Sequence, residues 1–264
     1  MNHPHDLPTR AAPAPASTAA GADDDAWTRL HTAACAPYRR SGRWAWHWAR
    51  GKLGYDPVFR GMLQRGDLPT KACVVDIGCG QGLVASLLQA AGDMQRAGQW
   101  PAAWPVAASG SAYTGIELMP KDVARAQAAL GALALAPRFV CADMCEAAIL
   151  PCDVVVILDV LHYVDHAAQD AVLQRVRDAL QPHGRLLLRG GDAARRRGFA
   201  ASQWVDRIVT WARGHRVPPT WGRPLDAWTA RLQALGFGVR AVPQSQGTPF
   251  ANVLLVADLK GAAT

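Results

Sequence analysis

The chain has 264 residues, half of them hydrophobic and 19% charged, so it is long enough to bury a sizeable core and most of it should be globular. The formal net charge of +7 is compatible with an acidic partner or an anionic substrate, but at this length it does not require nucleic acid. No apolar run approaches the length of a membrane span, and the N-terminus lacks the hydrophobic segment of a secretory signal.

The N-terminal quarter should consist of a leader and a helical cap. Residues 1–25 are biased toward Ala, Pro and Thr, which predicts a disordered leader that ends at a run of three aspartates. Residues 26–70 should form helices, because Trp44, Trp48 and Lys52 recur every four residues on one possible face. Pro57 should interrupt this cap before a second helical stretch.

Residues 71–264 should form one α/β domain. The expected strands are 72–78, 112–117, 138–143, 153–159 and 184–190. The expected helices between them are 82–91, 120–133 and 165–180. This alternation predicts a parallel sheet with helices on both faces. A helix over 224–236 then leads into strands 236–242 and 252–258, which should pair antiparallel because only a loop joins them.

The six cysteines do not indicate a metal site. They are Cys35, Cys73, Cys79, Cys141, Cys145 and Cys152. None belongs to a Cys-x-x-Cys pair, and several of the six lie in apolar runs typical of buried strands. This usage favours reduced core thiols in a cytoplasmic protein and argues against bound zinc.

The stretch VVDIGCGQG, residues 74–82, places three glycines two apart after a strand that carries Asp76 near its end. A nucleotide-dependent oxidoreductase would use GxGxxG and bind a pyrophosphate, which a neighbouring carboxylate would repel. A ligand with an ammonium group, such as S-adenosylmethionine, would be attracted by Asp76, and glycine lets the backbone approach it closely. An ordinary tight turn between strand and helix is the remaining alternative.

Further acidic residues follow the next two strands. Glu117 ends the second strand and can accept hydrogen bonds from both hydroxyls of a ribose. Asp143 ends the third and can accept from an adenine amino group, while Met144 can pack on the ring. One such acid is commonly a helix cap or a solvated residue. Consecutive strands that deliver suitable groups to one sheet edge predict a ligand site there.

The motifs VVDIGCGQG, YTGIELM, RFVCADM, VVVILDVLHYV and GRLLLRGGD together resemble the class I S-adenosylmethionine-dependent methyltransferases, over residues 71–258. The resemblance implies their Rossmann-like fold, a seven-stranded mostly parallel sheet with an antiparallel last strand, and S-adenosylmethionine as cofactor. It implies cofactor contacts at Asp76, Gly78, Cys79, Gly80, Glu117, Leu118, Asp143, Met144 and Leu158. The sequence departs from the family by a Trp- and Pro-containing insertion between Gly92 and Ala112, expected as a surface loop, and by Cys79 among the glycines.

Three other stretches, WARGKLGYDPVF, ILDVLHYVDHAAQDAVL and GTPFANVLLVA, resemble methyltransferases of bacterial aryl polyene and xanthomonadin-type pigment pathways. This narrower resemblance implies a phenolic or polyene-acyl acceptor, methylated on carbon or oxygen, either free or bound to an acyl carrier protein. The basic run Arg195, Arg196 and Arg197 is then either solvated surface or a docking site for that acidic carrier.

Methyl transfer needs a general base only where the acceptor must lose a proton. His162, just past the fourth strand, is the best-placed base for a phenol, or it only packs near the cofactor. Asp159, at the end of that strand, either orients the substrate or caps the next turn. It does not belong to an NPPY-type sequence, which argues against exocyclic amines of nucleic acid bases.

The acceptor pocket must come from outside the core strands. The candidate side chains are Tyr38, Trp44, Trp48, Lys52, Trp204 and Trp211. Aromatic helix faces are more often core than binding surface, but most of the ten tryptophans lie outside the core strands, so some should cover a flat apolar substrate. A catalytically silent scaffold subunit that binds the cofactor remains an alternative, whereas an RNA methyltransferase should show a recognisable nucleic-acid module.

Overall fold

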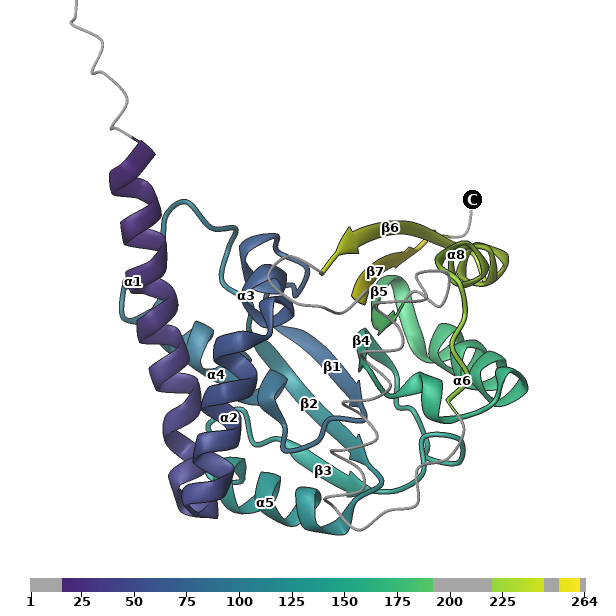
Figure 1. The fold of residues 1–264 in the computed structure, drawn as a ribbon, viewed down its shortest axis with the longest axis horizontal. Coiled ribbons are helices and arrows are strands. Elements are labelled where there is room, and N and C mark those ends of the chain that lie inside the picture. The colour runs from purple at the N-terminus through teal and green to yellow at the C-terminus, as the bar shows by residue number, and fades with distance from the viewer. Residues whose placement is uncertain (1–15, 192–219, 245–251, 262–264) are drawn as a thin grey trace, which may run out of the picture.

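The computed structural model describes residues 16–191, 220–244 and 252–261. Their strands form one sheet in the order β3-β2-β1-β4-β5-β7-β6 (Figure 1). The strands are β1 (Ala72–Ile77), β2 (Gly110–Glu117), β3 (Arg138–Cys141), β4 (Cys152–Leu158), β5 (Leu180–Gly191), β6 (Phe237–Pro243) and β7 (Asn252–Leu259). Neighbouring strands are parallel except that β7 runs antiparallel to β5 and β6, which confirms the predicted fold class and the antiparallel final pair.

Helices cover both faces of the sheet (Figure 1). One face carries the N-terminal helices and the first two helices of the α/β domain: α1 (Ala16–Cys35), the 3₁₀ helix η1 (Ala36–Ser41), α2 (Arg43–Tyr55), α3 (Pro57–Gln64), α4 (Leu83–Arg96) and α5 (Pro120–Leu130). The other face carries the 3₁₀ helix η2 (Leu161–Tyr163), α6 (His166–Ala179) and α8 (Leu225–Ala234). Because side chains alternate along a strand, Val154 and Val156 enter the first core while Val155 and Ile157 enter the second.

Local sequence explains where several helices begin. The Asp165 carboxylate accepts a hydrogen bond from the Ala168 N–H at 2.8 Å and caps α6. Asp56 caps α3 in the same way through the Val58 N–H at 3.1 Å, and Pro57 occupies the first helical position. Asp56 therefore marks the junction between α2 and α3.

The N-terminal helix begins earlier than the composition predicts. α1 starts at Ala16 rather than near residue 26, so residues 16–25 do not form a disordered leader. Alanine has the highest helix propensity, and this stretch is rich in it. In addition, Asp24 forms an ion pair with Arg60 of α3, at 2.8 Å, which ties this part of α1 to the cap.

The insertion after α4 is anchored in the core rather than lying wholly on the surface. Trp104 is buried in the core on the α4 face, and its ring meets the Trp100 ring edge-on at 5.3 Å between centroids. The Trp100 indole N–H donates to the Pro105 carbonyl at 2.8 Å. The predicted surface loop is therefore corrected: its tryptophans are structural. No helix in the described ranges is long and apolar enough to cross a membrane. All six cysteines are free thiols, three of them buried.

Candidate cofactor and active site

The glycine loop between β1 and α4 holds three left-handed residues. Gly78, Gly80 and Gly82 have φ values of +71°, +55° and +77°, a region that strongly favours glycine. A Cβ on Gly78 would lie 2.5 Å from the Val160 side chain, and a Cβ on Gly82 would lie 2.7 Å from the Phe139 ring. At Gly80 the nearest atom would be Cη2 of Trp48, at 3.9 Å. The outer glycines are thus required for packing, while the middle one leaves room for a ligand.

Glu117 supports this loop and still has acceptor capacity. Its Oε2 accepts from the Gly80 N–H and its Oε1 from the Met119 N–H, both at 2.9 Å. Each carboxylate oxygen has two lone pairs, so each can accept one further hydrogen bond, as two ribose hydroxyls would supply. The next residue, Leu118, is a large apolar side chain that is 60% exposed, which suits contact with an adenine ring.

Asp76 is a buried carboxylate beside the same loop. It is 3% exposed, and the Tyr113 hydroxyl donates to its Oδ2 at 2.7 Å. Burial raises the pKa of Asp76 to about 7, the Tyr113 hydrogen bond opposes this rise, and the Glu117 charge adds to it. Among the described residues no arginine or lysine forms an ion pair with Asp76. A buried acid of this kind fits a ligand that brings its own ammonium group.

The other predicted cofactor residues are distributed along the same edge. Asp143 is exposed, and its carboxylate accepts from the Cys145 N–H at 2.8 Å. Met144 and Leu158 are half-buried. Cys79 is buried, and its sulfur lies 2.6 Å from where a Cβ on Gly115 would be, so it fills space between β1 and β2. Its side chain therefore acts in packing. The contacts of these residues with a cofactor remain predictions.

Asp159 and Lys52 belong to a cluster of four charges. The buried Arg189 guanidinium donates through Nε to Oδ1 of Asp159 at 3.0 Å and through Nη2 to its other oxygen. The same guanidinium donates to both oxygens of Asp56, at 2.5 and 2.7 Å. Lys52 Nζ lies 2.8 Å from Asp56 Oδ2 and 4.0 Å from Asp159 Oδ2. We call Lys52, Asp56, Asp159 and Arg189 the Arg189 cluster.

The Arg189 cluster is strongly coupled. Burial by itself would raise the pKa of Asp56, but the hydrogen bonds and charge of Arg189, with Lys52, hold it well below its usual range. Burial would likewise lower the pKa of Arg189, but Asp159 and Asp56 raise it. Asp56 is thus kept ionised, and the Asp159 carboxylate is engaged by the Arg189 guanidinium. Sequence reasoning missed Asp56 and Arg189, although a charged residue inside the apolar run GRLLLRG signals a buried partner.

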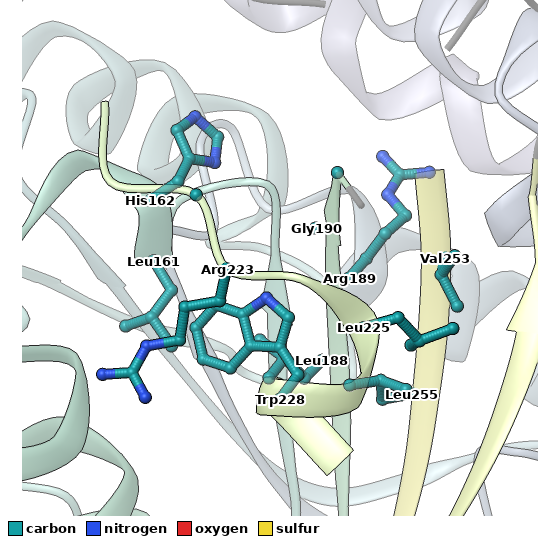
Figure 2. A pocket seen from close by; sticks show the side chains of 12 residues that line it. Leu161, His162, Leu188, Arg189, Gly190, Arg223, Leu225, Trp228, Val253 and Leu255 are labelled. Carbon is teal, nitrogen blue, oxygen red and sulfur yellow. The ribbon is translucent and has the colours of Figure 1, made fainter. Parts of the chain in front are cut away.

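His162 lies at the rim of a small, open pocket beyond β4 and β5 (Figure 2). Its backbone carbonyl accepts from the Trp221 N–H at 2.8 Å, and its ring lies 4.3 Å from the Tyr163 ring between centroids. The floor consists of apolar side chains from η2, β5, β7 and α8: Leu161, Leu188, Leu225, Trp228, Val253 and Leu255. Arg189 points away from this floor (Figure 2). The geometry brings the predicted base to the mouth of a pocket suited to an apolar group.

The predicted substrate residues of the cap have different environments. Tyr38 is fully buried, and its hydroxyl donates a hydrogen bond to the Gln81 carbonyl at 2.8 Å. It therefore supports the glycine loop from within the core. Trp44 is 52% exposed, with the Arg125 guanidinium 4.3 Å from its ring centroid. Of these aromatic residues Trp48 lies over the glycine loop. Trp204, Trp211 and the basic run Arg195–Arg197 lie outside the described residues.

The fold and the carboxyl edge of the sheet together define a class I methyltransferase. Residues 45–242 match the family model described as a methyltransferase domain, Methyltransf_23, and the chain therefore belongs to this family, whose cofactor is S-adenosylmethionine. Among curated proteins no sequence match was found.

Solved structures show the same fold. An O-methyltransferase family protein from Burkholderia thailandensis matches with a TM-score of 0.56 and 17% identity, over 85% of this chain and 63% of its own. Magnesium protoporphyrin IX methyltransferase from Synechocystis PCC 6803, with bound SAH, matches with a TM-score of 0.54 and 20% identity, over 80% of this chain and 84% of its own. Human N-acetylserotonin methyltransferase in complex with SAM matches with a TM-score of 0.55 and 15% identity, over 92% of this chain and 66% of its own. The chain thus spans less than two thirds of the length of the first of these proteins.

Proposed function

We propose that the protein transfers a methyl group from S-adenosylmethionine to a small aromatic, phenolic acceptor. The observation that carries this proposal is the buried Asp76 carboxylate beside the open position at Gly80. When bound, S-adenosylmethionine supplies an electrophilic methyl group on a sulfonium. Asp76 would hold its amino group and Glu117 its ribose. Asp143, Leu118 and Met144 would contact the adenine, as the family resemblance implies.

The character of the pocket supports an uncharged, flat acceptor. Its floor is apolar, and both arginines that line it are paired with carboxylates: Arg189 with Asp56 and Asp159, and Arg223 with Asp170. An anionic acceptor would therefore find no free charge in the Arg189 cluster, whereas an aromatic ring would bury apolar surface against Trp228 and its neighbours. Human N-acetylserotonin methyltransferase, which shares the fold, is named for an aromatic hydroxyindole derivative.

His162 is the proposed general base. From the rim of the pocket it would take the proton of the acceptor hydroxyl, which makes the oxygen, or the ring carbon beside it, nucleophilic. Such assistance contributes about 10²–10⁴-fold to a rate. An acyl carrier protein that delivers an aryl polyene acceptor, as in the pigment pathways, is the finer form of the proposal. It rests on the sequence resemblance alone.

A thermal-shift experiment tests the cofactor. Wild type and Asp76→Ala are heated with S-adenosylmethionine, its demethylated product or NAD. A ligand at about 100 times its dissociation constant should stabilise the wild type by roughly 2.7 kcal/mol. Stabilisation by the first two ligands, lost in Asp76→Ala, supports the proposal. Stabilisation by NAD alone would instead support an oxidoreductase.

A turnover assay tests the acceptor. Wild type, His162→Gln and the matched control His166→Gln are offered a panel of phenols and enol-bearing aromatics with labelled methyl donor. His166 begins α6, and its ring packs edge-on against Trp221, so the control removes a nearby imidazole outside the pocket floor. We expect turnover to fall at least a hundredfold only in His162→Gln. Cofactor binding without methylation of any phenol would favour the silent scaffold.

A further inference from the structure

The Arg189 cluster connects two parts of the chain that are distant in sequence. Arg189 is 2% exposed and comes from β5. One carboxylate that it binds, Asp56, belongs to the α2–α3 junction, and the other, Asp159, directly follows β4. Two cations and two carboxylates meet here, so their charges compensate. Removal of one carboxylate would leave a buried cation undercompensated, which is strongly unfavourable.

On the cap side, the cluster fixes the helix that covers the glycine loop. The Asp56 N–H donates to the Lys52 carbonyl at 3.1 Å and ends α2, while the Asp56 carboxylate caps α3. One turn before Lys52, α2 carries Trp48, whose ring stands 3.9 Å from the Cβ position of Gly80. The pairing of Asp56 with Arg189 therefore sets how closely α2 approaches the loop.

On the sheet side, the cluster fixes the residues after β4. Asp159 has φ +60°, and its N–H donates to the Arg189 carbonyl at 3.1 Å, so backbone and side chain are both bound to Arg189. The following residue, Val160, fills the space beside Gly78 so closely that a Cβ there would lie 2.5 Å away. One guanidinium thus fixes neighbours on both sides of the glycine loop.

We propose that Asp56 and Arg189 are positioning residues for the cofactor, which hold Trp48 and Val160 against the glycine loop. This inference rests on the proposed function, because the ligand that it concerns is the methyl donor or its demethylated product. Neither residue needs to touch the ligand. They act through α2 and through the segment after β4.

Calorimetric titration with S-adenosylhomocysteine tests the inference. Asp56→Asn keeps the shape and a good helix cap for α3, but removes the charge that binds Arg189. The matched control is Asp24→Asn, which breaks the ion pair with Arg60 inside the same cap but away from the loop. We expect S-adenosylhomocysteine to bind at least tenfold more weakly to Asp56→Asn and within twofold of wild type to Asp24→Asn. Arg189→Lys keeps the charge without the forked geometry, so its affinity should fall between these values.

The outcomes separate this inference from the proposed function. A wild type that does not bind S-adenosylhomocysteine overturns both. If the wild type binds and Asp56→Asn binds equally well, only the inference is overturned, even if the melting temperature falls, because a purely structural role lowers stability without weakening affinity. If Asp56→Asn does not fold, Arg189→Lys decides, because it keeps the positive charge but loses the forked contacts with Asp56 and Asp159. Unchanged affinity in that variant overturns the inference as well.

Discussion

The Asp76 carboxyl should make the stability of the ligand-free protein depend on pH. Its pKa is raised from 3.8 to about 7. Burial is the largest cause and the Glu117 charge adds to it, while the hydrogen bond from Tyr113 acts in the opposite direction. The folded protein therefore keeps a proton that the unfolded chain has released above about pH 4. The resulting stabilisation is fully present below the unfolded pKa and is lost as the pH rises through the folded pKa.

The size of this effect follows from the shift. About three pKa units correspond to about 4 kcal/mol, of which about 3 kcal/mol should be lost between pH 5 and pH 8. For a domain of this size that equals roughly 6–12 °C in melting temperature. Asp76→Asn removes the titration while its side-chain oxygen can still accept from Tyr113.

Differential scanning calorimetry of wild type and Asp76→Asn at pH 5 and pH 8, without ligand, measures the effect. We expect the wild type to lose roughly 6–12 °C more in melting temperature than the variant when the pH is raised from 5 to 8. Saturation with S-adenosylhomocysteine should reduce the difference between the two pH values, because its ammonium group compensates the ionised carboxylate. Equal pH dependence of the two proteins would refute the argument that Asp76 is buried without a cation.

Three further predictions concern the loop and its supports. Gly80→Ala should cost about 1–2 kcal/mol of stability, measured by denaturant titration, because the backbone at this position is left-handed. It should also weaken S-adenosylhomocysteine binding at least tenfold in calorimetry, because the new methyl group fills the open space next to Trp48. Tyr113→Phe should destabilise the protein by about 1–3 kcal/mol at pH 8, and by less at pH 5, where Asp76 is protonated; equal losses at both values would contradict the assignment. Trp104→Ala should cost about 3–5 kcal/mol in urea unfolding if the insertion is anchored as described, whereas a surface loop would lose under 1 kcal/mol.

The sequence was sufficient for the elements whose patterns are local. β1 and β4 are continuous apolar runs bounded by turn residues, so their strands and their common carboxyl edge could be predicted within a residue or two. The acids in the last two positions of β1 and β2, Asp76 and Glu117, were predicted for the same reason. The resemblance of these motifs to a known family then supplied the cofactor, which the family match supports.

The rest could not be predicted because it depends on contacts between distant segments. Asp56 and Arg189 are 133 positions apart, and neither position shows its partner in the sequence. Tyr38 was an expected substrate residue because it lies in an aromatic helical segment, yet its hydroxyl meets the Gln81 carbonyl in the core. Composition alone does not distinguish an alanine-rich helix from a disordered leader. The structure makes that distinction for residues 16–25 through α1.

The burial of the N-terminal helices limits how this enzyme can be divided or recombined. Leu30, Tyr38 and Leu53 are almost completely buried, and they share one core with α4 and the α4-facing side of the sheet. A fragment that begins at β1 would therefore expose a broad apolar surface and should aggregate rather than serve as a minimal catalytic unit. For the same reason, a chimera that exchanges these helices with those of a relative must also match the side chains of α4, α5 and the sheet that share this core. If the proposed acceptor site is correct, acceptor choice would instead be altered through the pocket floor, which belongs to the core on the opposite face of the sheet.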